Sequence, residues 1–419
     1  GGVKDNYDYS FTRKGIYIYS DGSWQNINQN NEDFFSENDL LNFLKIEPHP
    51  SKEETYFGTY WGGLLRHDDL TGSYTLYNDT NSALEGTIGD IQRERVTGLL
   101  FDKQENLWVS SFGSSRPLAL FSQGEEWFNF SLGVNKNIID IAQDREGYLW
   151  LPTFGNNGGC YVYDPGDDLS SSGDDRLRFI SSANSNLTSN IVNTVNVDLE
   201  GAVWIGTAEG PVVFDCGSDP FNTVDCQGDR IKVVQDSIVA FLLADQDVLA
   251  IAVDGGNQKW FGTRKGIFVQ SPGGEEEVFR FTTDNSPLFD NRIRDLTFNN
   301  NTGEMLIGTD RGLQSFITPT TGGEQFHSKQ EVLVYPNPVE PNYRGPIAIK
   351  GLVRDALVQI TDVNGNLITE VRAQGGQAVW YGKDLNGKEV STGVYLIFSS
   401  DEDAFDSPNS FVTKVMIIR

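Results

Sequence analysis

The sequence predicts an all-β protein: a seven-bladed β-propeller followed by an Ig-like antiparallel β-sandwich. Three observations predict this fold. A strand–turn–strand unit recurs along most of the chain, apolar and polar residues alternate with period two inside each copy, and Asn-Gly turns join short strands near the C-terminus. The predicted domains are residues 1–328 for the propeller and residues 329–419 for the sandwich.

The recurring unit is a strand ending in Gly-Thr or its equivalent, a short loop, a Gly and a second strand. Clear copies are "VWIGTAEGPVVF" from Val203 and "KWFGTRKGIFV" from Lys259. The residues aligned at the end of the first strand, about 50 residues apart, are Thr12, Thr59, Ser111, Thr153, Thr207, Thr263 and Thr309. Such units cannot bury their faces alone, and radial stacking in a propeller buries them.

Several copies carry an acidic turn followed by a tryptophan. The acidic residues are Asp102, Asp144 and Asp198. We predict that they shape turns between inner strands, because Asp bonds to nearby backbone; a catalytic or metal-binding role is the alternative. The tryptophans, predicted to pack between blades because they recur at blade period, are Trp108, Trp150, Trp204 and Trp260.

The first copy, "FTRKGIYIY" from Phe11, is incomplete. Only "KDNYDYS" separates it from the start of the chain, so its innermost strand is missing or frayed. A propeller ring must close to protect its strand edges, and we expect the missing strand to lie upstream. No basic segment with an apolar run opens the chain, so we also expect a targeting signal upstream.

The repeat ends near residue 320. The stretch "TPTTGGEQFHSKQE" is a linker by composition. Short alternating strands follow, with Asn-Gly turns at Asn364 and Asn386, and they continue to the final "FVTKVMIIR". This pattern predicts the sandwich.

Charge and motif content exclude several classes of function. The 419 residues include 32 basic and 59 acidic side chains, a net charge of −27, which argues against a nucleic-acid partner. The apolar run "IVAFLLA" from Ile238 is too short to cross a bilayer, so no transmembrane segment is predicted. The three His have no metal-ligand spacing, and no phosphate loop or nucleophile elbow appears. We therefore predict no catalytic residue, no cofactor and no metal, and interpret the acidic stretch from Asp164 as a solvated loop rather than a Ca²⁺ site.

Two of the three cysteines are placed to form a disulfide. Cys216 and Cys226 flank "GSDPFNTVD" between two strand-like runs, and a hairpin would bring their sulfurs together. A pair of reduced thiols is the alternative. Cys160 is predicted to be a small buried apolar residue.

The loops after each Gly-Thr should line one mouth of the propeller, and their residues form two predicted sectors. The basic sector, which requires a closed ring, comprises Arg13, Lys14, Arg264, Lys265 and Arg311. The aromatic sector comprises Tyr60, Trp61, Phe112 and Phe154. Positive charge on an acidic protein suits an anionic partner, and aromatic faces suit sugar rings. The alternative is a set of polar turns with local salt bridges.

The sequence also resembles known families. Its "WIGT…G" units resemble the two-component-regulator propeller repeat, and "YPNPV", "TDVNGN" and "KVMIIR" resemble the C-terminal domain of type IX secretion substrates in Bacteroidetes. The combination, from about Val96 onward, is similar to the PorZ-like proteins, surface components of that secretion system. Those proteins have two propellers before the tail, so this chain is expected to be a C-terminal portion.

The resemblance implies an exported, non-enzymatic protein at the outer-membrane cell surface. It would belong to the attachment complex with the sortase, bind anionic lipopolysaccharide or another anionic glycan, and pass it on for linkage to secreted cargo. Its tail domain would be retained. Two alternatives remain: a periplasmic glycan-sensing propeller of a hybrid two-component regulator, and a secreted glycan-active enzyme with a removable sorting tail.

Overall fold

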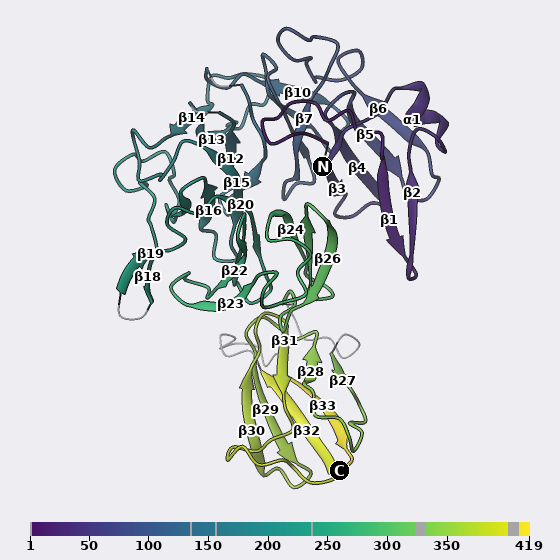
Figure 1. The fold of residues 1–419 in the computed structure, drawn as a ribbon, viewed down its shortest axis with the longest axis vertical. Helices are drawn as coiled ribbons and strands as arrows, with labels where there is room; N and C mark the ends of the chain where they lie inside the picture. Colours follow the sequence, from purple (N-terminus) through teal and green to yellow (C-terminus); the bar gives the residue numbers. More distant parts are fainter. Residues whose placement is uncertain (1, 135, 156, 236–237, 324–331, 401–409) are drawn as a thin grey trace. The chain divides into compact units, whose positions relative to one another are not determined.

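The computed structural model describes residues 2–134, 136–155, 157–235, 238–323, 332–400 and 410–419. Within these ranges the chain forms antiparallel sheets and one short helix, α1 (Asp33–Glu37), as Figure 1 shows. The chain divides into two compact units. The N-terminal unit comprises Gly1–Val197, Gly201–Ile231 and Phe241–Val248, and the C-terminal unit comprises Asp198–Glu200, Lys232–Ala240 and Leu249–Arg419.

The propeller sheets are built from strands that are consecutive in the chain. The four-stranded sheets are β3 (Phe43–Pro48), β4 (Glu54–Thr59), β5 (Gly63–Asp68) and β6 (Tyr74–Tyr77); β7 (Val96–Phe101), β8 (Leu107–Ser111), β9 (Leu118–Phe121) and β10 (Trp127–Phe130); β11 (Ala142–Gln143), β12 (Leu149–Thr153), β13 (Gly159–Asp164) and β14 (Arg176–Ile180); and β20 (Val248–Val253), β21 (Lys259–Thr263), β22 (Gly266–Gln270) and β23 (Glu277–Phe281).

Shorter propeller sheets have two or three strands. They are β1 (Ile16–Ser20) and β2 (Ser23–Ile27); β15 (Val192–Val197), β16 (Val203–Thr207) and β17 (Gly210–Phe214); β18 (Lys232–Gln235) and β19 (Ile238–Phe241); and β24 (Ile293–Asn299), β25 (Glu304–Thr309) and β26 (Gly312–Ile317). The predicted all-β propeller is confirmed, while the count of seven blades stays a prediction. In the incomplete first copy, the pairing found within residues 2–15 is a single bridge between Val3 and Tyr9.

In the copies that carry Gly-Thr, the Thr and the following Gly close a tight hairpin. In the β21–β22 turn, the Thr263 hydroxyl donates to the carbonyl oxygen of Gly266 at 2.9 Å and accepts from the N–H of Lys265 at 2.9 Å. Gly266 has φ +118°, and a Cβ there would lie 2.3 Å from the carbonyl oxygen of Phe281. Thr207 makes the same hydroxyl contact across the β16–β17 turn, at 2.8 Å. The two residues between Thr and Gly are therefore not needed to hold the turn.

The acidic turns bind the tryptophans that follow them. The indole N–H donates to the carboxylate of the aspartate six positions earlier, at 3.1 Å for Trp108 and 2.9 Å for Trp150. The Asp144 carboxylate also accepts from the N–H groups of Gly147 and Tyr148. Burial raises the pKa of Asp144, and the Trp150 bond opposes that shift.

The predicted burial of all four tryptophans is confirmed. Each is at most 3% exposed. Trp150 packs with Val192 and Val203 of the following sheet, and Trp260 packs with Ile293 of its own following sheet.

An ion pair is buried in the C-terminal unit. The Lys259 ammonium lies 2.8 Å from the Asp198 carboxylate, with the two side chains 0% and 4% exposed. Its other donors reach the carbonyl oxygens of Asn257 at 3.0 Å and Pro272 at 2.6 Å. Burial lowers the pKa of Lys259, and the Asp198 carboxylate opposes that shift. Asp198 also accepts from the N–H of Glu200 at 2.9 Å, so its predicted turn role is confirmed and an ion pair is added.

The tail domain is a two-sheet sandwich within the C-terminal unit. Its sheets are β27 (Leu333–Tyr335), β28 (Ile347–Lys350) and β31 (Gln377–Trp380), and β30 (Leu367–Arg372), β29 (Leu357–Asp362), β32 (Gly393–Ser400) and β33 (Ser410–Ile417). Ile349 and Trp380 of the first sheet share one core with Ile360 and Ile397 of the second. The Ig-like topology stays a prediction, and the predicted boundary between residues 328 and 329 lies outside the described residues.

The stretch predicted to be a linker, residues 318–331, begins as buried structure. Thr318 and Thr320 are 2% and 0% exposed. The Gln377 side chain, from the first sandwich sheet, donates to the carbonyl oxygen of Pro319 at 2.9 Å. The expectation of a linker is therefore corrected for the first half of the stretch, because its polar groups are bonded inside the C-terminal unit. The second half lies outside the described residues.

Replacing Lys259 by Met should destabilise the protein strongly. The change leaves the Asp198 carboxylate buried without its partner, which costs about 3–5 kcal/mol of unfolding free energy. Urea unfolding followed by tryptophan fluorescence measures the loss. Lys52→Met at an exposed position is the control and should shift the midpoint little. Equal midpoints for the two variants would contradict the structural role of the pair.

Candidate functional site

The predicted aromatic residues of the N-terminal unit lie close together. The ring centroids of Tyr60 and Phe112 are 5.9 Å apart, and those of Phe112 and Phe154 are 6.1 Å apart. Trp61 joins the group through Tyr9, whose ring lies 4.7 Å away. Tyr60 is fully buried, so it supports the group instead of offering a surface to a ligand.

Two tyrosines that the sequence prediction missed complete this group. The Tyr7 ring lies parallel to Phe112 at 5.4 Å and meets Phe154 at 5.0 Å. The Tyr60 hydroxyl donates to the carbonyl oxygen of Tyr7 at 2.7 Å. Burial raises the pKa of Tyr7. The alternation of tyrosine with polar residues in "NYDYS" is the signal that could have found Tyr7 and Tyr9.

Two arginines that directly precede β7 also reach this group. The Arg95 guanidinium lies over the Tyr9 ring at 4.4 Å, donates to its hydroxyl at 2.8 Å and lies 3.3 Å from the Asp90 carboxylate. Arg93 lies over the Trp61 ring at 3.9 Å. Such contacts between a cation and an aromatic face contribute about 0.5–2 kcal/mol. Neither arginine belongs to a Gly-Thr loop, so the repeat did not reveal them.

A cavity of about 730 Å³ adjoins the aromatic group. Its lining combines aromatic, amide and basic side chains from four loops of the N-terminal unit: Thr87, Ile88, Arg95, Phe112, Gly113, Val134, Lys136, Asn137, Phe154, Gly155 and Asn157. The volume is within the range of about 300–1,000 Å³ that is usual for ligand pockets. Phe112 and Phe154 are thus the predicted residues that face a cavity, and Lys136 is a basic residue that the prediction missed.

A polar group also occupies the inner strand β3. The Lys45 ammonium lies 2.8 Å from the Asp140 carboxylate, and Glu47 follows two positions later on the same face of the strand. Burial raises the pKa of Glu47 to about 7; Lys45 lowers this pKa and Asp140 raises it. Glu47 therefore changes charge near neutral pH.

The predicted basic residues divide between the two units. Arg264 and Lys265 occupy the β21–β22 turn and Arg311 the β25–β26 turn of the C-terminal unit, all three exposed. Arg13 and Lys14 are exposed in the N-terminal unit, with Arg13 4.0 Å from Asp39. Their predicted meeting across a closed ring stays a prediction.

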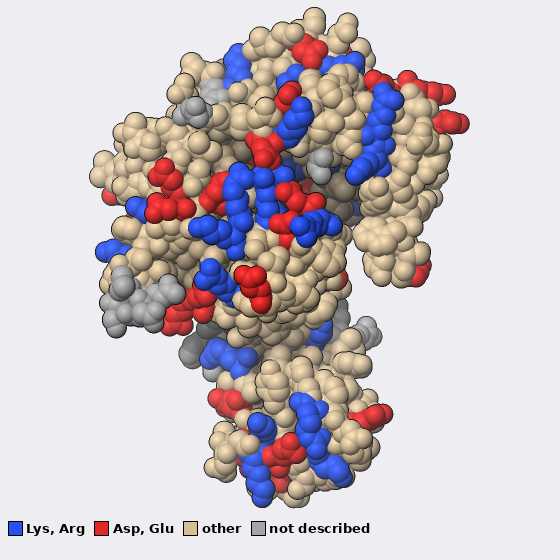
Figure 2. Space-filling view, in the orientation of Figure 1, with Lys and Arg blue, Asp and Glu red and all other residues tan. Residues whose placement is uncertain are grey.

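Two further arginines, missed by the prediction, extend the basic residues of the C-terminal unit. Arg292 precedes β24 and Arg294 lies in it, and both ion-pair with Asp310. Arg311 pairs with Asp290 at 3.3 Å. On the face that Figure 2 shows, Lys and Arg side chains likewise lie beside Asp and Glu side chains. We name Arg264, Lys265, Arg292, Arg294 and Arg311 the basic rim.

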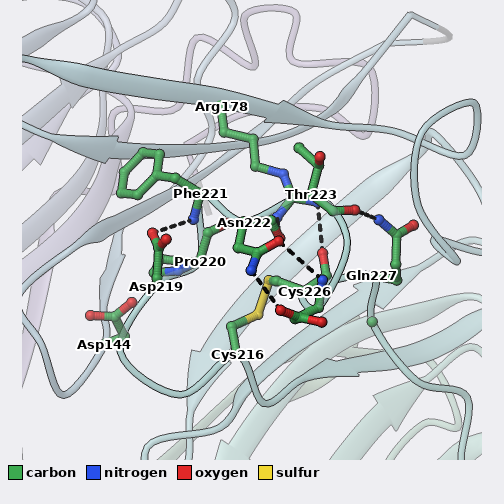
Figure 3. Close-up of a disulfide and its surroundings, with 12 residues drawn as sticks. Asp144, Arg178, Cys216, Asp219, Pro220, Phe221, Asn222, Thr223, Cys226 and Gln227 are labelled. Carbon is green, nitrogen blue, oxygen red and sulfur yellow. Dashed lines mark hydrogen bonds between the residues drawn. A yellow bond between two sulfur atoms is a disulfide. The ribbon is translucent and has the colours of Figure 1, made fainter.

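The structure contains a disulfide between Cys216 and Cys226 (Figure 3). The buried Arg178 guanidinium holds the loop that the bond closes, donating to the carbonyl oxygens of Pro220 at 2.5 Å and Cys226 at 2.7 Å. Burial lowers the pKa of Arg178. Cys160 is free and buried, which confirms the expectation for that residue.

Among the described residues, no group of three or more His, Cys, Asp and Glu is placed to hold a metal ion. A search of the same residues finds no helix long and apolar enough to span a membrane.

Fold and site together define an all-β propeller with an aromatic, ligand-sized cavity and a C-terminal sandwich. Among solved structures, the fold is similar to PorZ, an essential bacterial surface component of the type IX secretion system of Porphyromonas gingivalis. The identity is 23%, the TM-score is 0.65, and the match covers 96% of this chain and 55% of that one. It is also similar to the extracellular domain of a hybrid two-component system from B. thetaiotaomicron, at 15% identity and TM-score 0.51, covering 97% of this chain and 53% of that one.

This chain therefore spans about half the length of the solved structures that it matches. No protein-family profile and no curated protein matches the sequence. The similarities establish the fold.

Unfolding the oxidised protein without reductant should expose one reactive thiol. Cys160 supplies that thiol because Cys216 and Cys226 are bonded. Titration with a chromogenic thiol reagent in denaturant counts the thiols, and reductant should restore all three. Finding three thiols before reduction would contradict the disulfide.

The contribution of Glu47 to stability should fall as pH rises. Its folded pKa is raised from 4.5 to about 7, so the favourable contribution is complete below the unfolded pKa and is lost through about pH 7. Because Glu47 is partly exposed, the unfolding free energy of the native protein relative to Glu47→Gln should drop by about 1–2 kcal/mol across this range. Urea unfolding at several pH values tests this, and a constant or rising difference would contradict it.

Proposed function

We propose that the protein is an exported, non-enzymatic binding module of the type IX secretion attachment complex at the outer-membrane surface. It binds an anionic glycan, such as anionic lipopolysaccharide, and presents it to the sortase that anchors cargo. The resemblance of the repeats and tail to PorZ-like proteins supports this proposal, as does the fold similarity to PorZ.

The basic rim is the observation that carries the binding part of the proposal. Five basic side chains lie in the β21–β22 turn, at the start of β24 and in the β25–β26 turn of the C-terminal unit, in a chain of net charge −27. Local positive potential on an acidic protein attracts anionic ligands, and the five rim cations outnumber the two carboxylates, Asp290 and Asp310, with which three of them pair. Arg supplies charge-assisted, often bidentate bonds to carboxylate or phosphate, and Lys supplies a point charge.

The β21–β22 and β25–β26 turns do not depend on the rim side chains that they carry. Thr263 and Gly266 hold the β21–β22 turn through the hydroxyl–carbonyl bond and the positive φ. Thr309 makes the same bond to Gly312 at 2.9 Å across the β25–β26 turn. Variants at the intervening positions should therefore fold normally.

Replacing the turn cations Arg264, Lys265 and Arg311 by Gln should weaken binding of anionic lipopolysaccharide by about 3-fold to 100-fold. Each exposed charge contact contributes roughly 0.2–1 kcal/mol, and their losses add. Isothermal titration with lipopolysaccharide in a dispersing detergent measures the affinity. Binding by the native chain should also fall as salt rises, because a Debye length of about 10 Å at 0.1 M screens exposed charges.

A matched variant separates local from overall charge. Lys52, Lys103 and Lys232 are exposed elsewhere, and changing them to Gln alters the net charge equally. This control should bind like the native chain. Equal affinity of the rim variant and the native chain would place the glycan elsewhere, with the sandwich as the competing site, and absence of binding by the native chain would refute the proposed ligand.

A further inference from the structure

Two cations, Arg95 and Lys136, are among the described residues that line the cavity of the N-terminal unit. Arg95 is neutralised by Asp90, 3.3 Å away, and donates to the Tyr9 hydroxyl. In the described part of the chain, no carboxylate lies within ion-pair distance of the Lys136 ammonium. A ligand that brings one negative charge would supply the missing partner.

Backbone bonds fix the position of this cation. The N–H of Gly113 donates to the carbonyl oxygen of Lys136 at 2.8 Å, and the N–H of Phe154 donates to that of Asn137 at 2.8 Å. The segment that carries Lys136 is thereby held between the loops that follow β8 and β12. A site built on such paired backbone keeps its geometry without a ligand.

The cavity also has an apolar wall. The Phe112 and Phe154 rings lie 6.1 Å apart, and Tyr7 stacks on Phe112 within 1° and holds it in place. Ile88 and Val134, which are 61% and 98% exposed, extend this wall outward. Aromatic faces pack against the apolar C–H face of a sugar ring, and exposed aliphatic edges shield it from water.

Polar groups that suit sugar hydroxyls complete the lining. Amide side chains are supplied by Asn137 and Asn157, and Thr87 donates its hydroxyl proton to the carbonyl oxygen of Phe112 at 3.0 Å, which leaves its oxygen able to accept. Gly113 keeps the space open, because at its φ of +76° a Cβ would lie 3.1 Å from Thr87 Cγ2.

We propose that this cavity binds a sugar ring carrying a single anionic group, carboxylate or phosphate, with Lys136 paired to the anion and the Phe112–Phe154 wall against the ring. The inference rests on the proposed function and deepens it, because it places a specific saccharide subsite in the N-terminal unit, distinct from the basic rim. Its volume of about 730 Å³ accommodates such a ring with room for a neighbouring unit.

The test compares three probes on the full chain by isothermal titration: galacturonic acid, galactose 6-phosphate and galactose. At least one acidic sugar should bind about tenfold or more tighter than galactose, as expected for one charge-assisted bond. The tighter of the two acids identifies the source of the anion. Equal binding of all three sugars, or binding of none, would overturn the proposal.

Three variants assign the roles. Lys136→Met should reduce the affinity for the acidic sugar to that for galactose, and Phe154→Ala should weaken all probes. Val134→Glu adds a negative charge at a fully exposed edge without disturbing packing, and should weaken only the acidic sugars. Lys52→Met is the matched control and should change nothing. Unchanged acidic-sugar binding in both Lys136→Met and Val134→Glu would remove the cavity as the site.

The outcomes separate this inference from the proposed function. If lipopolysaccharide binds through the basic rim while the affinity for acidic sugars does not depend on Lys136, the cavity proposal fails and the proposed function stands. If acidic sugars bind in a Lys136-dependent way while the chain does not bind lipopolysaccharide, the cavity is a saccharide site and the proposed function fails.

Discussion

The hydroxyl–carbonyl bond across the Gly-Thr turns is the constraint on which the proposed basic rim depends. Thr263 bonds to Gly266 and Thr309 bonds to Gly312, each at 2.9 Å. Because a hydroxyl closes the turn and a glycine adopts the positive φ, the turn does not require particular side chains at the two intervening positions. The same turn can therefore carry Arg-Lys in one copy and other residues in another. The side chains at the turns vary while the backbone of the sheets is kept.

Buried aspartates connect the turns between inner strands to the packing between neighbouring sheets. A carboxylate such as that of Asp254 accepts from its own turn and, at 3.0 Å, from the indole of Trp260, which packs into the next sheet. Turn geometry and packing between sheets are thereby linked in one hydrogen-bond network. The acidic composition is thus partly structural: burial raises the pKa of Asp254, and bonds to Trp260 and the turn oppose that shift.

The sequence predicted the features that depend on short-range residue patterns. Period-two alternation and the Gly-Thr spacing predicted the propeller sheets, and the residues after each Gly-Thr led to the aromatic group at Phe112 and Phe154. The sequence could not reveal Lys136, because it lies outside the repeat and reaches the cavity only through contacts between loops that are far apart in the chain. The six-residue spacing of Asp and Trp is visible in the sequence, but the hydrogen bond from the indole N–H to the carboxylate is seen only in the structure.

Composition gave the wrong prediction where contacts between distant residues determine whether a residue is buried. The Thr-rich stretch from Thr318 has the character of a linker, yet its first residues are buried because Gln377 and neighbouring backbone satisfy their polar groups. Lys259 has the pattern of a polar strand end, yet it is fully buried because Asp198 and two carbonyl oxygens supply three acceptors. A charged group can be buried only with such a complete set of partners, and no short sequence pattern shows that the partners are present.

We propose that loops of the propeller, and not the sandwich, bind the anionic glycan. Hydrogen–deuterium exchange of the full chain with and without anionic lipopolysaccharide tests it most directly. We expect slowed exchange in the turns at residues 263–266 and 309–312 and in the loop at residues 112–113, with exchange in the sandwich strands unchanged. Protection confined to the sandwich strands β27 to β33, with the propeller turns unaffected, would contradict it.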